Sequence, residues 1–240
     1  MPHEGPFDLI IADPPYGDTA LPWDRIVPGW EALALKALRP AGSLWLFGSL
    51  RYFLRTGLPA GWRLAQDIVW EKHNGSSMAA DRFKRVHEHV VQLYPKRAPW
   101  SDVYNEVQTT PDATPRAVRR KTRPSHWGGI GESTYVSHDG GPRLMRSVIE
   151  MASPRSGLHR TEKPVALLEI LIRTSCPPGG VVGDFFAGSG AVGEACINTG
   201  RRYVGCEADP VMAQKARERL QHALSATDDA SGARMVEATR

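Results

Sequence analysis

Cysteine is scarce in this sequence, and its few copies fit no metal or redox motif. Three cysteines occur in 240 residues, and no pair of them has the CxxC spacing. An odd number without such spacing argues against a disulfide framework and against a zinc site. We therefore expect a cytoplasmic protein without a bound metal, with buried free thiols at Cys176, Cys196 and Cys206.

Long apolar runs are missing as well. No stretch approaches the ~18 apolar residues of a transmembrane helix, so we expect no membrane association. The first residues, MPHEG, have no basic region followed by an apolar one, which predicts no secretion signal. Apolar residues still make up 41% of the chain, enough for one substantial core or for one core with an inserted lobe.

Charge is moderate but unevenly spread. The whole chain carries +4, whereas residues 72–150 hold 13 Lys/Arg against 8 Asp/Glu, a net charge of +5. A local basic excess suits a polyanionic partner. A solvated surface explains the same count equally well, so charge alone leaves both interpretations open.

Both ends of the chain show alternating strand and helix signals. Within the strand-like run FDLIIA at 7–12, residues 9–12 are continuously apolar, which is typical of a strand covered by helices on both faces. Similar patterns, with Pro and Gly at helix ends, predict an α/β protein with a Rossmann-like doubly wound sheet. The expected elements are strands at 43–49, 62–72, 87–96 and 201–209, a strand entering a glycine-rich turn within 179–190, and helices at 28–38, 165–175, 191–200 and 210–224.

The middle of the chain lacks this order. Residues 98–147 are rich in Pro, Gly, Thr and charge, and show no clear periodicity. An irregular segment of this length inside a compact domain is usually functional or disordered.

The turn DFFAGSG at 184–190 indicates a nucleotide-like ligand. Gly188 and Gly190 stand where strand becomes helix, so a ligand can approach the backbone amides. The next strand ends in Glu207, an acid suited to a ribose diol. These residues predict an adenosine-containing cofactor, and because Gly193 completes a G-x-G-x-x-G pattern they leave NAD and S-adenosylmethionine both open.

The stretch FDLIIADPPY places polar groups at the end of the first strand. Asp13 follows that strand directly, and Pro14 and Pro15 lack amide donors, which leaves the nearby carbonyls free to accept hydrogen bonds. Tyr16 offers a flat face for stacking. A carboxylate, a free backbone carbonyl and an aromatic side chain at one place suit a ligand that has a planar ring and an exocyclic amine.

Four motifs in this order resemble the β class of S-adenosylmethionine-dependent DNA amino-methyltransferases. They are DPPY at 13–16, SVIEMASPRSGLHRTEKP at 147–164, DFFAGSGAVGEA at 184–195 and GRRYVGCEAD at 200–209. The resemblance covers residues 7–72 and 147–220 and implies the class I methyltransferase fold with a circularly permuted motif order. It also implies a catalytic part at 1–72, a strand plus an inserted target-recognition region at 73–146, a cofactor-binding part at 147–224 and a flexible tail at 225–240.

The resemblance also assigns roles to residues. Catalysis falls to Asp13, Pro14, Pro15 and Tyr16, which would hold an amine of a base flipped out of the duplex. Lys163 would pair with the methionine carboxylate of the cofactor, and Glu207 with its ribose. The full set implied for S-adenosyl-L-methionine is Asp13, His159, Thr161, Lys163, Asp184, Phe186, Ala187, Gly188, Ser189, Gly190, Glu207 and Ala208.

The target implied is N6 of adenine in double-stranded DNA, because Asp at the first motif position usually accompanies adenine in this family. Cytosine N4 remains the alternative, and a non-catalytic nucleic-acid-binding protein that keeps the cofactor pocket is an alternative of another class. We also expect a homodimer. The expected DNA contacts are Arg116, Arg119, Arg120, Lys121, Arg123 and Trp127.

The sequence departs from the family pattern in two places. Phe185 replaces the usual proline after the motif acid, which we expect to alter packing more than chemistry. Family members commonly carry an upstream segment with an acid for the adenine, and here only MPHEG precedes the first strand. We expect a more open adenine end and a sheet with one strand fewer.

Overall fold

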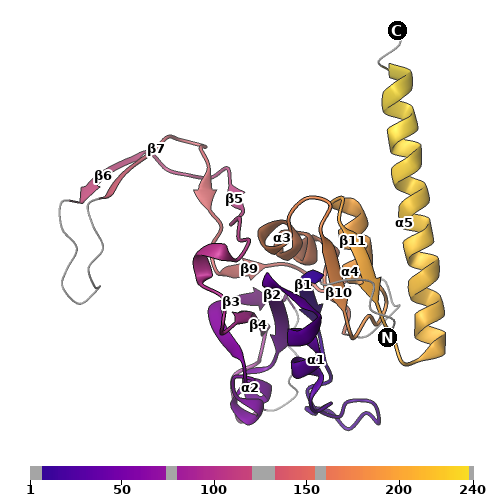
Figure 1. Cartoon of the computed structure of the whole chain (residues 1–240). Coiled ribbons are helices and arrows are strands. Elements are labelled where there is room, and N and C mark those ends of the chain that lie inside the picture. Colours follow the sequence, from indigo (N-terminus) through magenta and orange to yellow (C-terminus); the bar gives the residue numbers. More distant parts are fainter. Residues whose placement is uncertain (1–6, 74–79, 121–132, 155–160, 238–240) are drawn as a thin grey trace. The chain divides into compact units, whose positions relative to one another are not determined.

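The core of the protein is a seven-stranded mixed sheet. The structure is a computed structural model that describes residues 7–73, 80–120, 133–154 and 161–237. The strand order is β11-β10-β1-β2-β4-β3-β9 (Figure 1). The strands are β1 (Phe7–Ala12), β2 (Leu38–Gly48), β3 (Trp62–Glu71), β4 (His87–Pro95), β9 (Val148–Glu150), β10 (Val181–Asp184) and β11 (Arg202–Gly205).

Four consecutive strands of this sheet are parallel. β1 pairs in parallel with β10 and with β2, and β10 pairs in parallel with β11. β4 is antiparallel to both β2 and β3, whereas β9 is parallel to β3. The carboxyl ends of β1, β10 and β11 therefore lie at one edge of the sheet.

Helices cover both faces of this sheet. Leu9 and Ile11 of β1 pack in a core with α3 (Val165–Ser175) and α4 (Ala191–Asn198). Ile10 and Ala12 pack in a second core with α1 (Trp30–Ala37) and α2 (Leu50–Thr56). Every residue of β1 is buried, as its apolar run predicts. The predicted α/β class and doubly wound sheet are confirmed.

The chain leaves β1 and β10 toward opposite faces. After β1 it passes through α1 to β2, whereas after β10 it passes through α4 to β11. Neighbouring strands with connections on opposite faces form a topological switch point, and a crevice opens beyond their carboxyl ends. The motifs DPPY and DFFAGSG follow these two strands. The fold therefore brings these two motifs, which lie about 170 residues apart in the sequence, to the same edge of the sheet.

Residues Val107–Arg146 form a compact unit of their own. They contain the pairs β5 (Thr109–Thr110) with β8 (Arg143–Leu144) and β6 (Arg116–Arg120) with β7 (Ser133–Ser137) (Figure 1). The sequence predicted no regular structure here, because such short strands lack a buried face with alternating apolar residues. This unit has seven Lys/Arg against three Asp/Glu, so its net charge of +4 equals that of the whole chain.

Several elements differ from the prediction. Helix α2 was missed, since it is only seven residues long; Ser49 caps it by accepting a hydrogen bond from the Tyr52 amide at 3.1 Å. Strand β2 begins at Leu38, before Pro40, in an irregular stretch of its pairing with β1. Helix α5 (Pro210–Glu237) does not end at residue 224. The expected helix end at residue 224 is therefore corrected to Glu237, because no proline interrupts the helix after Pro210, whereas the flexibility expected for 225–240 stays a prediction.

Candidate active site

Asp13 is held by two neighbours at the carboxyl end of β1. Its Oδ1 accepts a hydrogen bond from the Tyr16 hydroxyl at 2.5 Å, and its Oδ2 forms an ion pair with the Lys163 ammonium. Burial and the negative charge of Asp13 raise the pKa of Tyr16, which keeps its hydroxyl protonated and able to donate. The Tyr16 ring packs on Tyr52 with the ring centroids 5.5 Å apart. The carboxylate of Asp13 thus has a fixed orientation, with 26% of its side chain exposed.

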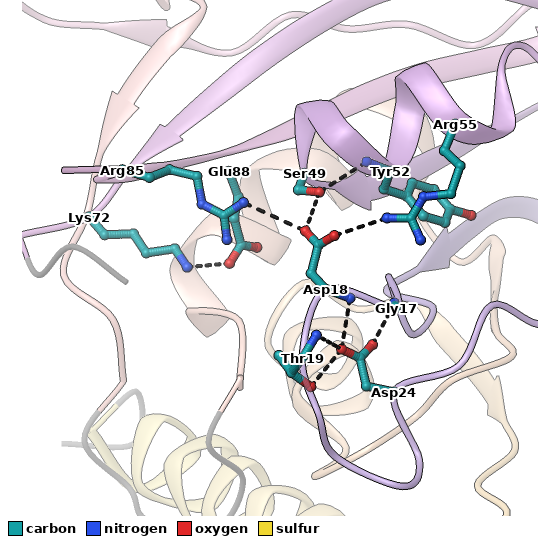
Figure 2. A network of polar contacts seen from close by, with 10 residues as sticks. All are labelled: Gly17, Asp18, Thr19, Asp24, Ser49, Tyr52, Arg55, Lys72, Arg85 and Glu88. Carbon is teal, nitrogen blue, oxygen red and sulfur yellow. Dashed lines mark hydrogen bonds and ion pairs between the residues drawn. The ribbon is translucent and has the colours of Figure 1, made fainter. Parts of the chain in front are cut away.

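The segment after Tyr16 is fixed by a second carboxylate. Asp24 is 7% exposed and accepts hydrogen bonds from the consecutive amides of Gly17, Asp18 and Thr19 at 2.7 to 3.0 Å (Figure 2). It also accepts one from the Thr19 hydroxyl at 2.7 Å. Burial opposes its ionisation, but these bonds outweigh burial and lower the pKa of Asp24. The backbone that leaves the DPPY motif therefore has a defined course.

Asp18 ties this segment to the sheet and to α2. Its carboxylate accepts a hydrogen bond from the Ser49 hydroxyl at 2.6 Å and one from Arg55 at 3.1 Å, and it lies 3.7 Å from an Arg85 nitrogen (Figure 2). Ser49 also caps α2, so one hydroxyl links the helix start to the segment. The sequence motifs gave no indication of Asp18 or Asp24. The only hint in the sequence is that both residues follow Tyr16 closely. Aspartates are so common in loops that this closeness does not identify them.

Alternating charges continue inward from Asp13. Lys163 lies 3.4 Å from Glu88 of β4, and Glu88 forms a second ion pair with Lys72, which follows β3. We call Lys72, Glu88, Lys163 and Asp13 the charge chain. Sequence reasoning missed Lys72 and Glu88. The only signal for Glu88 was that it is the single acid of its strand, and only the tertiary structure brings it beside Lys163.

The glycine-rich turn has the backbone that such a turn requires. Gly188 and Gly190 have φ angles of 50° and 79°, in the left-handed region that favours glycine. A Cβ on Gly190 would lie 3.1 Å from Ala216 of α5. Among the described residues, a Cβ on Gly188 would meet only the Phe186 carbonyl, at 3.9 Å, so they leave the space beside this turn open.

Glu207 lies against this turn. Its carboxylate accepts hydrogen bonds from the Gly188 amide at 2.8 Å and from the Asp209 amide at 2.9 Å. A carboxylate has about four acceptor sites, so two remain. An acid with spare acceptors beside an open glycine turn fits the ribose of an adenosine group. The residues present therefore fit S-adenosylmethionine.

Asp184, at the end of β10, is an unusual carboxyl. It is 2% exposed, and burial, with a smaller contribution from the charge of Asp13, raises its pKa to about 7. The Phe186 amide donates to it at 3.0 Å, and this hydrogen bond offsets part of that shift. The Tyr203 hydroxyl donates to its other oxygen at 3.4 Å. Burial is the main cause of this shift, and the charge of Asp13 at the end of β1 adds to it.

This carboxyl has a consequence for stability. Because the pKa of Asp184 is higher in the folded state than its ordinary value of 3.8, the folded state binds the proton more tightly, and stability falls as the pH rises from about 4 to about 7. We expect Asp184→Asn to raise the unfolding temperature at pH 8 and to raise it less at pH 5. Thermal unfolding followed by circular dichroism checks this, with exposed Asp67→Asn as the control. An equal effect at both pH values would contradict the buried-carboxyl explanation.

The other predicted site residues fall into four groups. Near the ends of β1 and β10, Pro14 and Ser189 are buried, Ala187 donates its amide to the Cys206 carbonyl, and the Thr161 carbonyl accepts from Lys163. In the compact unit, Arg116, Arg119 and Arg120 lie on β6. Pro15, Phe186 and Ala208 lie at the expected strand ends, whereas His159, Lys121, Arg123 and Trp127 lie outside the described residues.

The part of the chain that the structure describes contains no helix with the length and apolar character needed to span a membrane. The same residues hold no group of three or more His, Cys, Asp or Glu side chains that could bind a metal ion. The three cysteines are free thiols, with Cys176 and Cys196 buried and Cys206 half-buried.

Comparison with known proteins gives a consistent result. A family model described as DNA methylase (N6_N4_Mtase) matches residues 7–218. The Type II methyltransferase M2.DpnII of Streptococcus pneumoniae is 26% identical over 246 residues, which is 89% of this chain and 82% of that protein. The crystal structure of the M1.HpyAVI-SAM complex has a TM-score of 0.58 and 26% identity, and the match covers 90% of each chain. The cytosine-N4-specific PvuII DNA methyltransferase has a TM-score of 0.56 at 14% identity, over 92% of this chain and 86% of that one, a likeness in fold alone.

Proposed function

We propose that this chain, which belongs to the DNA methylase family and is an S-adenosylmethionine-dependent DNA methyltransferase of the β class, methylates N6 of adenine. The observation that carries the choice of adenine is Asp13, the first residue of the DPPY motif. Because M2.DpnII is named a Type II methyltransferase, we extend the proposal to a defined DNA sequence and to a role in restriction-modification.

Asp13 and the Pro14 carbonyl would each accept one N–H of the target amine. The lone pair of an aromatic amine is delocalised into its ring, which makes the nitrogen a poor nucleophile. Two acceptors placed out of the ring plane favour a pyramidal nitrogen and point its lone pair in one direction. Asp13 and Pro14 therefore orient the amine for attack. The base reaches them only when flipped out of the duplex, and the Tyr16 ring would stack on it.

The cofactor supplies a methyl group on a positively charged sulfur. As the N–C bond formed, the C–S bond would break with its electron pair left on sulfur, so that a neutral thioether would leave and neither centre would be oxidised or reduced. The nitrogen would then give up one proton to water. On the protein side, Glu207 would accept from the ribose hydroxyls, and the turn at Gly188 and Gly190 would lie against the adenosine group.

The compact unit at Val107–Arg146 would contact DNA. Its excess of basic residues supports phosphate contacts, which release counterions on binding. We expect replacement of Arg116, Arg119 and Arg120 by alanine to weaken DNA binding similarly for all sequences. The slope of log K against log salt should fall in magnitude by about 1 for each arginine–phosphate interaction that the substitutions remove.

Binding titrations at several salt concentrations measure this effect. An exposed acid of the same unit, Asp139→Ala, is the control and should leave the salt slope unchanged. An unchanged slope in the triple variant would remove these arginines from the DNA interface, and a loss confined to one sequence would indicate base contacts instead.

The proposal is tested by sequencing DNA with a method that detects methylated bases. The DNA comes from a methylation-free bacterial host that expresses this chain. N6-methyladenine in one sequence context supports the proposal. Detection of N4-methylcytosine would support the mechanism but would contradict the choice of adenine as the target base. The absence of any mark would oppose catalysis on DNA and would favour a non-catalytic nucleic-acid-binding protein.

A further inference from the structure

The charge chain contains a second buried acid, Glu88, which Lys163 links to Asp13. Lys163 contacts the carboxylates of Asp13 and Glu88, and its side chain is only 7% exposed. Burial disfavours its charge, but these two carboxylates outweigh burial and raise the pKa of Lys163. Lys163 is therefore a permanent cation between two anions.

Two donors of Lys163 have hydrogen-bond acceptors among the described residues, and Glu88 approaches Lys163 as an ion pair without a hydrogen bond. An ammonium carries three N–H groups. Asp13 takes one, the Thr161 carbonyl accepts at 3.1 Å, and Glu88 lies at 3.4 Å. The expectation from the family resemblance was that Lys163 binds the methionine carboxylate of the cofactor. The observed contacts join Lys163 to the catalytic acid, and its binding of the methionine carboxylate stays a prediction.

The carboxylate oxygen of Glu88 that does not face Lys163 is also in contact with an ammonium group. The Lys72 ammonium pairs with it, as Figure 2 shows, and lies 4.6 Å from the centre of the Trp70 ring. Burial raises the pKa of Glu88, but the charges of Lys163 and Lys72 outweigh burial and lower it. Both side chains are largely buried, at 12% and 13% exposure. Such a pair is held rigidly and costs desolvation energy, so a purely stabilising role is a weak explanation for it.

We propose that Glu88 is a positioning residue for methyl transfer, which acts through Lys163 to fix the carboxylate of Asp13. The physical reason is that Lys163 would otherwise be free to rotate away from Asp13, and a misplaced acceptor no longer orients the amine. The inference rests on the proposed methyl transfer and holds for either amine, adenine N6 or cytosine N4.

The test is a double-mutant cycle of Glu88→Gln and Lys163→Met, with the cofactor Kd measured by titration calorimetry. We expect Glu88→Gln to lower kcat about tenfold and Lys163→Met about 10- to 100-fold, each with a cofactor Kd within about twofold of wild type. In the Lys163→Met background, Glu88→Gln should have no further effect, because its action passes through Lys163. Glu71→Gln, on the exposed surface of β3, is the matched control and should leave kcat unchanged.

Several results would overturn the proposal. The first is an unchanged kcat in Glu88→Gln, and the second is additive losses in the double variant. The third is a cofactor Kd raised tenfold by Lys163→Met with kcat unchanged, which would indicate that Lys163 binds the methionine carboxylate. If Glu88→Gln does not fold, Lys72→Gln replaces it in the cycle and should lower kcat severalfold; an unchanged kcat there would equally count against the proposal. Inactive wild-type protein that still binds the cofactor would refute the proposed function instead.

Discussion

Asp13→Ala should abolish methyl transfer and leave cofactor binding largely intact. The variant removes the acceptor that orients the amine, and interactions of this kind contribute about 10²- to 10³-fold to the rate. The side chains that face the glycine-rich turn, Glu207 above all, are unchanged. We expect kcat to fall by at least about 10²-fold, measured as transfer of a labelled methyl group to DNA, with a cofactor Kd within about tenfold of wild type.

Two controls make this result interpretable. Asp67→Ala removes an exposed carboxylate from β3 and should leave kcat unchanged. Asp13→Asn keeps the shape and one acceptor oxygen, but loses the charge that pairs with Lys163, so its kcat should lie between those of Asp13→Ala and the wild type. Full activity in Asp13→Ala would refute the mechanism, whatever base the wild type methylates.

Glu207→Ala should weaken cofactor binding about 10- to 100-fold. A hydrogen bond to a charged acceptor contributes ~1.5–3 kcal/mol, and each ~1.4 kcal/mol is a tenfold change in Kd. The variant also frees the Gly188 amide, which donates to Glu207 at 2.8 Å, so the turn loses a support as well. Titration calorimetry with S-adenosylmethionine measures the effect.

A paired variant separates these two contributions. Glu207→Gln keeps an acceptor for Gly188 but removes the charge, so we expect a smaller loss, of about tenfold. At saturating cofactor, both variants should recover most of their kcat, because Glu207 does not contact the amine. An unchanged Kd in Glu207→Ala would show that Glu207 only supports the turn and would contradict its ribose role.

The strand and helix pattern made the central fold predictable from sequence. The fully buried run at 7–12 and the two motifs that follow strands indicated a doubly wound sheet, because local periodicity and turn residues determine such elements. The short pair β6 with β7 was not predictable in this way. Its pairing joins Arg116–Arg120 to Ser133–Ser137, and neither strand carries an apolar alternation that marks it.

By itself the sequence determined which chemistry stands at the ends of β1 and β10: an acid, two prolines and a tyrosine at one, a glycine-rich turn at the other. It did so because these motifs act through residues that are close in sequence. Only the tertiary structure decided what surrounds Asp13. Pairing of β3 with β4 brings Lys72 beside Glu88, and the segment that leads into α3 brings Lys163 into contact with Glu88 and Asp13. Ion pairs between such distant residues leave no local pattern, which is the physical reason that Glu88 was invisible until the chain was folded.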